Sequence, residues 1–155
     1  MSRRRPIAAT VAGALTLAAA AIGVAAGERI EGPVAASVVR VIDGDTLKVD
    51  ATIWLGTRLT VNARIRGIDT PEIRGACPRE KTMAEAARMA LAAVVARAPL
   101  RLIAIENDKY GGRIVADIVT ADGADVASLM LATGLARPYD GARRRGWCDV
   151  AGVAE

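Results

Sequence analysis

Acidic residues gather in two short segments of the sequence, and each segment contains a residue that shapes the backbone. In "VIDGDTLKV", Asp43 and Asp45 flank a glycine that lies between two apolar runs, which is the pattern of a β-hairpin turn. In "RIRGIDTPEI", Asp69 and Glu72 lie on either side of a Thr-Pro pair whose proline restricts the backbone. The second aspartate of the first segment leaves two interpretations: a plain turn, or a turn that also presents carboxylates to a cation.

The chain contains no histidine, and this limits the chemistry that its side chains can perform. Imidazole bases, His-ligated zinc, His-metal nucleases and Ser-His-Asp arrangements are all excluded. The serines form no G-x-S-x-G nucleophile elbow either. Carboxylates, arginines and tyrosines remain, and they suit an oxygen-liganded cation with an anionic substrate. Hydrolysis of phosphate esters is therefore the natural candidate reaction.

The two acidic segments can meet if the strands around them form a meander. The end of the third strand then lies near the start of the second, so Asp45 and Asp69 would share one cation, with Glu72 one turn away. Arg64 and Arg66 lie on the polar face of the strand that leads to Asp69, and arginines beside a carboxylate pair can clamp an anion. Taken singly, each segment is also explained as a plain turn or a helix cap.

Hydrophobic periodicity predicts the elements that must position these residues. Alternating or continuous apolar runs predict five strands, at residues 36–43, 46–55, 58–69, 100–107 and 113–121. Helical spacing predicts two helices, within residues 78–99 and 125–134. A meander followed by a helix and two further strands predicts an α+β, mainly β domain, namely a five-stranded OB-fold-like barrel with two to three helices. The tail from Pro138 onward is expected to be irregular.

The first 26 residues have the layout of a secretory signal peptide. Three arginines precede an uncharged, alanine-rich stretch, and Val24-Ala25-Ala26 offers a small-residue cleavage site. Three of the 21 basic residues and none of the 17 acidic ones lie there, so cleavage lowers the formal net charge from +4 to +1. We expect residues 27–155 to form the domain and the protein to be periplasmic or secreted. An uncleaved membrane anchor is the alternative, because the stretch could span a bilayer.

The two cysteines are Cys77 and Cys148, and their wide separation fits no close-spaced metal motif. In an oxidising compartment they predict a disulfide that joins the tail to the middle of the domain. Loop-closure entropy gives such a bond up to roughly 4 kcal/mol. Two unpaired thiols are the alternative. The run Arg143-Arg144-Arg145 is interpreted as a solvated face or a phosphate-attracting tail, without a catalytic role.

Taken together, the motifs resemble the staphylococcal nuclease (thermonuclease) family. The resemblance is carried by "VIDGDTLKV", "ARIRGIDTPE" and "DKYGGRIVADI", with "GLARPY" as a weaker fourth block, in the order and spacing of that family. It implies a five-stranded OB-like barrel that binds one Ca2+ beside the 5′-phosphate of the scissile nucleotide. It also implies products with a 3′-phosphate and little sequence specificity.

The resemblance implies a ligand set for the cation. By position, Asp45 and Asp69 resemble the calcium carboxylates, and Thr70 would offer its backbone carbonyl. Asp43 resembles a nearby acid that acts through water. This sequence therefore predicts an all-oxygen site, which suits Ca2+.

Catalytic roles also follow from the resemblance. Glu72 matches the carboxylate that activates or orients the attacking water, and Arg64 matches the first phosphate-binding arginine. The second arginine departs from the family pattern, because Gly112 intervenes before Arg113. A Gly-Gly pair can absorb one extra residue as a loop or bulge, and we therefore assign the role to Arg113.

Two tyrosines and a lysine complete the predicted substrate site. Tyr110 aligns with a phosphate-contacting tyrosine of the family, and Lys109 precedes it. Tyr139 would stack on a base, although packing explains it equally well.

The sequence thus predicts a secreted or periplasmic Ca2+-dependent nuclease that hydrolyses DNA and RNA. Single-stranded substrate is expected to be preferred, no obligate protein partner is inferred, and membrane contact is expected only if the N-terminal segment stays uncleaved. The alternative is a non-catalytic OB-like module that binds nucleic acid or another anionic polymer. The retained carboxylates and Arg64 favour the enzyme, whereas the shifted Arg113 and near-neutral mature charge favour the module.

Overall fold

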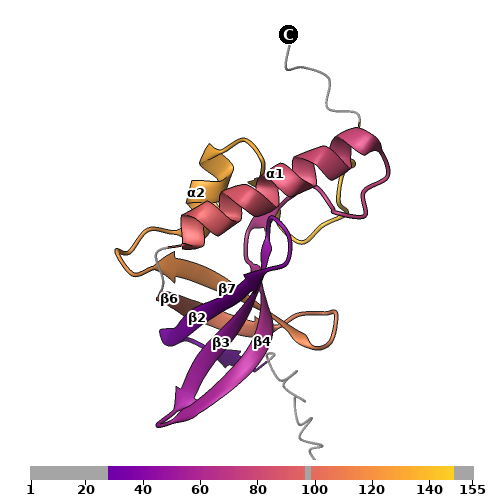
Figure 1. Cartoon of the computed structure of the whole chain (residues 1–155). Coiled ribbons are helices and arrows are strands. Elements are labelled where there is room, and N and C mark those ends of the chain that lie inside the picture. Colours follow the sequence, from indigo (N-terminus) through magenta and orange to yellow (C-terminus); the bar gives the residue numbers. More distant parts are fainter. Residues whose placement is uncertain (1–27, 97–98, 149–155) are drawn as a thin grey trace, which may run out of the picture.

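The computed structural model describes residues 28–96 and 99–148 of the chain (Figure 1). The predicted signal peptide and its cleavage site lie outside the described residues. Neither of the two helices within the described ranges is long and apolar enough to cross a membrane.

Five long strands close into a barrel. β2 (Val34–Val41), β3 (Thr46–Trp54) and β4 (Thr57–Ile65) form an antiparallel meander. β7 (Arg113–Thr120) then pairs in parallel with β4, and β6 (Leu100–Asn107) pairs antiparallel with both β7 and β2, which closes the circle. This arrangement confirms the predicted α+β, mainly β class and the five-stranded OB-fold-like barrel.

Both helices lie over one end of the barrel (Figure 1). α1 (Pro78–Val95) begins with a proline, whose missing N–H costs nothing in the first turn of a helix. Its buried residues recur every three or four positions: Glu80, Ala84, Ala87, Leu91 and Val95. α2 (Val126–Ala132) begins after Asp125, whose carboxylate accepts a hydrogen bond of 2.9 Å from the backbone N–H of Ser128. Both helices were predicted.

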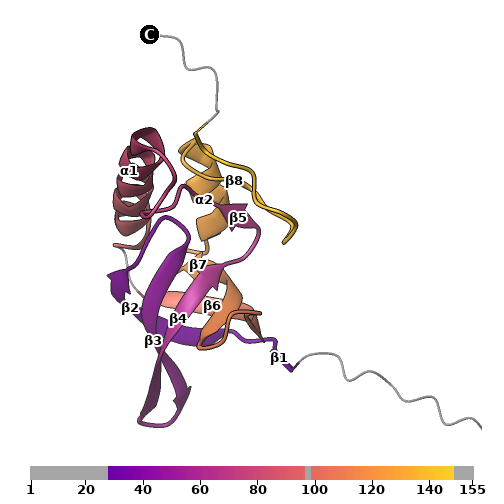
Figure 2. The same cartoon turned by 90° about the vertical axis from the view of Figure 1, so that its right-hand side faces the viewer.

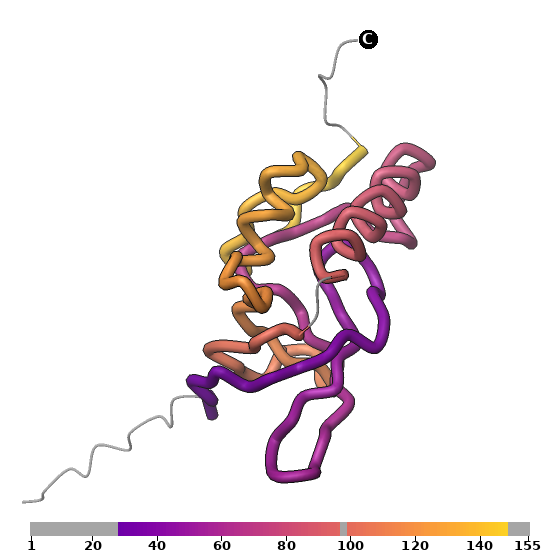
Figure 3. The backbone as a smooth tube through the Cα atoms, turned by 60° about the vertical axis from the view of Figure 1, so that its left-hand side comes forward, coloured from indigo at the N-terminus to yellow at the C-terminus, as the bar shows by residue number. Residues whose placement is uncertain are grey.

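The core lies between the inner face of the barrel and the two helices. Apolar side chains from all five barrel strands and both helices make it up, including Ala36, Leu47, Val49, Ile65, Leu91, Leu102, Ile118 and Met130. The β3–β4 hairpin extends beyond this core, away from the helices (Figure 3). The core therefore fixes the helix-covered end of the barrel, where the two acidic segments emerge.

A second, two-stranded sheet follows the barrel at this end. The predicted strand 58–69 is interrupted at Gly67, whose φ of 81° takes the chain out of the barrel. β5 (Ile68–Asp69) then pairs antiparallel with β8 (Arg137–Pro138), which lies between α2 and the C-terminal tail (Figure 2). The prediction of one continuous strand was therefore wrong. Of the tail that was expected to be irregular, Pro138 belongs to β8, and residues 139–148 contain no helix or strand. The short β1 (Arg29–Ile30), which pairs with β6, was not predicted.

Candidate active site

Two aspartates from the two acidic segments are brought to the same end of the barrel. Asp45 directly precedes β3, Asp69 ends β5, and they are only 2 % and 1 % exposed. Arg64 on β4 pairs across the strands with Thr46, and its Nη1 lies 2.6 Å from Asp45 Oδ1. Its Nη2 donates a 3.0 Å hydrogen bond to the carbonyl of Ile68. Arg64 thereby ties the two acidic segments together.

The turn before β3 owes its glycine to close packing rather than to a left-handed backbone. A Cβ on Gly44 would lie 2.7 Å from Ala87 Cβ and 2.8 Å from Thr70 Oγ1, which is closer than real side chains allow. Asp43 Oδ1 accepts a 3.0 Å hydrogen bond from the backbone N–H of Asp45, which shapes the turn. The turn is thus pressed against α1 and the second acidic segment.

A groove of about 600 Å³ opens beside these carboxylates. Most of the residues predicted for the site line it: Asp43, Asp45, Arg64, Glu72, Lys109, Tyr110, Arg113 and Tyr139. Asp69 and Thr70 do not line it, but both are almost fully buried. Residues from four distant parts of the sequence therefore share one groove.

Burial raises the pKa of Asp45 to about 6, because its charged form loses solvation in the protein interior. The guanidinium of Arg64 opposes this shift, and the carboxylate of Asp43 adds to it. A positively charged ligand would favour the ionised form of this carboxyl group.

Asp69 is surrounded by residues that the sequence did not predict for the site. Arg137, its β8 partner, donates from Nε to Asp69 Oδ2 at 3.0 Å, and the indole of Trp147 donates to the same oxygen at 3.1 Å. Arg144 Nε lies 2.5 Å from Asp69 Oδ1. Arg137 lies within the block "GLARPY" but was given no role there, and no local pattern indicates Arg144 or Trp147.

Arg113 lies at the start of β7, after Gly112, which adopts the left-handed conformation with φ of 79°. Its Nε contacts Asp108 Oδ2 at 2.7 Å, and its guanidinium lies 5.3 Å from the centre of the Tyr110 ring. Lys109 approaches the same ring at 5.3 Å. The extra glycine is accommodated in this loop, and Arg113 still lines the groove.

Arg66, predicted to face the same way as Arg64, is used differently. Its guanidinium contacts Asp117 at 3.2 Å and Glu106 at 3.1 Å, joining the end of β4 to β6 and β7. The hydrogen bond and the charge of Arg66 lower the pKa of Glu106. The guanidinium of Arg66 is therefore paired with two carboxylates of the barrel, and these contacts join its strands.

Tyr139 follows β8 and lies against Arg64, whose guanidinium is 5.7 Å from the centre of its ring. Its hydroxyl donates a 2.7 Å hydrogen bond to the carbonyl of Ala142. The ring thus lines the groove while its hydroxyl is engaged in the tail.

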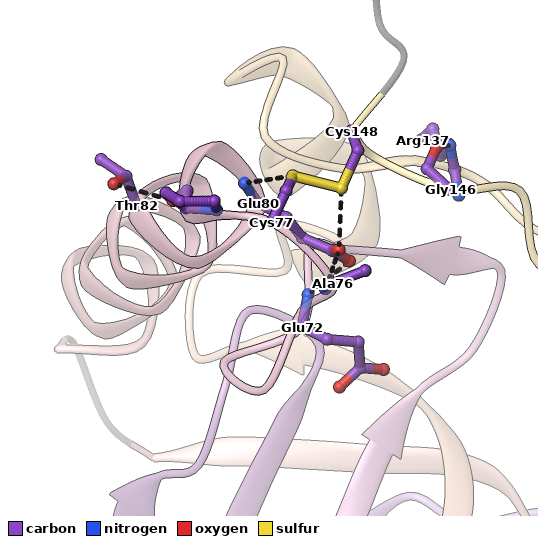
Figure 4. The surroundings of a disulfide bond; sticks show 9 residues. Glu72, Ala76, Cys77, Glu80, Thr82, Arg137, Gly146 and Cys148 are labelled. Carbon is purple, nitrogen blue, oxygen red and sulfur yellow. Dashed lines mark hydrogen bonds between the residues drawn. A yellow bond between two sulfur atoms is a disulfide. The ribbon is translucent and has the colours of Figure 1, made fainter.

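Glu72 lies in a loop that is fastened to the start of α1 (Figure 4). The buried carboxylate of Glu80 accepts hydrogen bonds from the backbone N–H groups of Ala76, at 2.9 Å, and of Glu72, at 3.4 Å. The predicted disulfide between Cys77 and Cys148 is present beside it. These two sulfurs and Glu80 cluster within 4.8 Å, but the sulfurs are bonded to each other and so offer no thiolate to a metal.

The acidic centre has the donor set of a hard-cation site. Oxygens of Asp45, Asp69 and Glu72 converge on one positive group, the guanidinium of Arg144. Among the described residues, Asp69 Oδ1 is buried and accepts no hydrogen bond, although the charged Arg144 Nε approaches it. A buried carboxylate oxygen of this kind, in a group of carboxylates that converge on one positive charge, fits an oxygen-liganded divalent cation.

Comparison with known protein families agrees with this geometry. A family model described as staphylococcal nuclease homologue matches residues 62–147, which is more than half of the chain. The matched range contains Arg64, Asp69, Glu72 and Arg113, and it begins after Asp45. No curated protein matches the chain significantly.

Proposed function

The chain belongs to the staphylococcal nuclease family, and from this premise we propose that it is a Ca2+-dependent nuclease that hydrolyses phosphodiester bonds in DNA and RNA. The observation that carries the proposal is the convergence of Asp45, Asp69 and Glu72 on one guanidinium, that of Arg144. Asp45, Glu72 and Arg64 also line one groove. A charged, partly enclosed groove of this kind suits a phosphodiester backbone better than it suits a neutral substrate.

Asp45 and Asp69 would hold the cation, with Asp43 acting through water and the carbonyl of Thr70 as a further ligand. Their oxygens are buried or partly buried, so little hydration has to be removed from them when a cation binds. Bound there, Ca2+ would polarise the phosphate and neutralise developing negative charge.

Glu72 would take the proton of the attacking water. Its carboxylate lines the groove and is 47 % exposed, so water can reach it. Arg64 and Arg113 would donate hydrogen bonds to the phosphate oxygens as negative charge builds up on them. The loop of Glu72 is held by Glu80, which supports a fixed position for the base.

Tyr110, Lys109 and Tyr139 would bind the nucleotides on either side of the scissile bond. Tyr110 is 62 % exposed and carries two cations against its ring, which suits a site for both a base and a phosphate. Aromatic stacking needs an unpaired base, and this supports a preference for single-stranded substrate.

An exported protein fits these features. The disulfide between Cys77 and Cys148 is stable in an oxidising compartment, and the N-terminal sequence has the layout of a signal peptide. We propose a periplasmic or secreted location, with membrane anchoring as the alternative.

A non-catalytic nucleic-acid-binding module is the second candidate function. Two observations favour it: Arg113 is engaged by Asp108, and Arg144 occupies the acidic centre. Such a module would bind single-stranded DNA without cleaving it.

Cleavage of a fluorescently labelled single-stranded oligonucleotide tests the proposal. The protein should cleave it in millimolar Ca2+ and not in EGTA, and Asp69→Asn should abolish the Ca2+-dependent activity. Binding without cleavage by the folded protein in Ca2+ would contradict the enzyme and support the module.

A further inference from the structure

Arg144 places its guanidinium among three carboxylates of the candidate site. Its Nε lies 2.5 Å from Asp69 Oδ1, its Nη2 lies 3.4 Å from Asp45 Oδ2, and its Nη1 contacts Glu72 Oε1. Two of these carboxylates are the proposed cation ligands and the third is the proposed base. A single side chain of the protein therefore contacts the whole acidic centre.

The segment that carries Arg144 is fastened at both ends. We refer to residues 140–148 as the arginine loop. It begins just after β8, and the guanidinium of Arg137 donates hydrogen bonds to two backbone carbonyls of this loop. Trp147 donates to Asp69 at its far end, and Cys148 is tied to α1 by the disulfide. The fold thus holds the arginine loop against the carboxylates.

Arg144, unlike Arg64, contacts all three carboxylates, so its guanidinium takes the position at which a Ca2+ ion shared by them would lie. Ca2+ requires its ligands at 2.3–2.6 Å, and Arg144 Nε already lies 2.5 Å from Asp69 Oδ1. Both groups are cationic and would repel each other across this short distance. Binding of one therefore requires the other to leave.

We propose that Arg144 is a built-in competitor for the catalytic cation, so that the arginine loop sets the Ca2+ concentration at which the site fills. This inference rests on the proposed function, because it takes Asp45 and Asp69 to be cation ligands. When Ca2+ binds, Arg144 turns away from the carboxylates and Glu72 loses its ion pair with Arg144. The apparent affinity is then the intrinsic affinity multiplied by the fraction of molecules in which Arg144 has left.

Calorimetric titration with Ca2+ tests the proposal without relying on activity. The full-length protein is compared with Arg144→Gln, Arg144→Lys and a matched control, Arg143→Gln. Within the described part of the chain Arg143 forms no hydrogen bond or ion pair, so its substitution removes the same charge but not the contacts. Circular dichroism establishes that each variant is folded.

We expect Arg144→Gln to bind Ca2+ about tenfold more tightly than wild type if about nine molecules in ten hold Arg144 in place. Arg144→Lys should fall between them, because a lysine cannot contact three carboxylates through a planar fork, and Arg143→Gln should stay within about twofold of wild type. If wild type binds Ca2+ and Arg144→Gln binds it with unchanged or weaker affinity, the competitor proposal is overturned and the proposed function is not. Absence of Ca2+ binding by all the folded proteins would contradict the proposed function as well.

Discussion

Asp45 is more stable in its neutral form than an ordinary aspartate, yet the proposed chemistry needs its charge. The carboxyl is 2 % exposed, and burial raises its pKa to about 6 from an ordinary value of 3.8. Protonation therefore stabilises the folded state, fully at pH values below about 4, and this contribution is lost as the pH rises through 6. A buried carboxyl group with a raised pKa is typical of a functional site, and a bound cation would stabilise its charged form.

Replacing Asp45 with asparagine should reveal the free energy that the buried charge of Asp45 costs the folded state. In EGTA, Asp45→Asn should be more stable than wild type at pH 8, by about 1–3 kcal/mol, because the amide carries no charge to bury. The advantage should shrink as the pH falls from 7 to 4, where the wild-type carboxyl becomes neutral. Thermal unfolding across this pH range measures the stability difference between the variant and wild type. A difference that does not change with pH would contradict the raised pKa of Asp45.

Arg64 is expected to be intolerant of replacement even by lysine. Its guanidinium contacts Asp45 and the carbonyl of Ile68 through two different nitrogens, which an ammonium group cannot reproduce. Arg64→Lys should lower kcat by about 10²–10³-fold. Arg58→Lys, at an exposed position on the distant hairpin, is the matched control and should leave kcat unchanged. Equal kcat values for the two variants would argue against a transition-state role for Arg64.

The residues of the candidate site differ in how far the sequence could predict them. Asp45, Asp69, Arg64 and Glu72 lie in short segments where turn residues and charges occur together, so their local pattern was informative. The run of arginines that contains Arg144 is most simply interpreted as a solvated face or a phosphate-attracting tail, without a catalytic role. The position of Arg144 depends on contacts with residues about 70 to 100 places earlier in the chain, which no local pattern encodes.

Among the elements, the turn before β3 depends on a residue without a side chain at position 44. Gly44→Ala should destabilise the protein by about 1–3 kcal/mol, because the added methyl group would collide with Ala87 and Thr70. Gly111→Ala is the control, since open space surrounds it and its backbone is not left-handed; its effect should stay within about 0.5 kcal/mol. Urea denaturation compares the two, and equal stabilities would show that the turn can move away from α1.

The strands and helices themselves were predictable because their apolar residues follow the periods of a sheet and a helix. β5 and β8 were not, because each has only two residues and is defined by its partner. The break at Gly67 separates β4 from β5, and the alternation that runs from Arg58 to Arg66 changes phase there, because the next apolar residue is Ile68. These two short strands form because the fold brings their segments together, not because their residues favour a strand.

At the scale of the whole molecule, the disulfide is the main covalent constraint. It joins residues 71 positions apart and fastens the arginine loop to the start of α1. In the loop-closure model such a bond contributes up to about 4 kcal/mol, so reduction should lower Tm by several degrees. Scanning calorimetry with and without reductant measures the change. The double variant Cys77→Ser/Cys148→Ser should not respond to reductant, and a wild-type protein equally indifferent to it would argue against the bond.

The most direct test of the proposed nuclease is the single-turnover cleavage rate of Glu72→Gln on single-stranded DNA in saturating Ca2+. Loss of a general base should lower this rate by about 10²–10⁴-fold. The matched control is Glu85→Gln, on the exposed side of α1 and paired there with Arg88, which should cleave at the wild-type rate. A rate for Glu72→Gln within threefold of wild type would contradict Glu72 as the base and the catalytic site built around it.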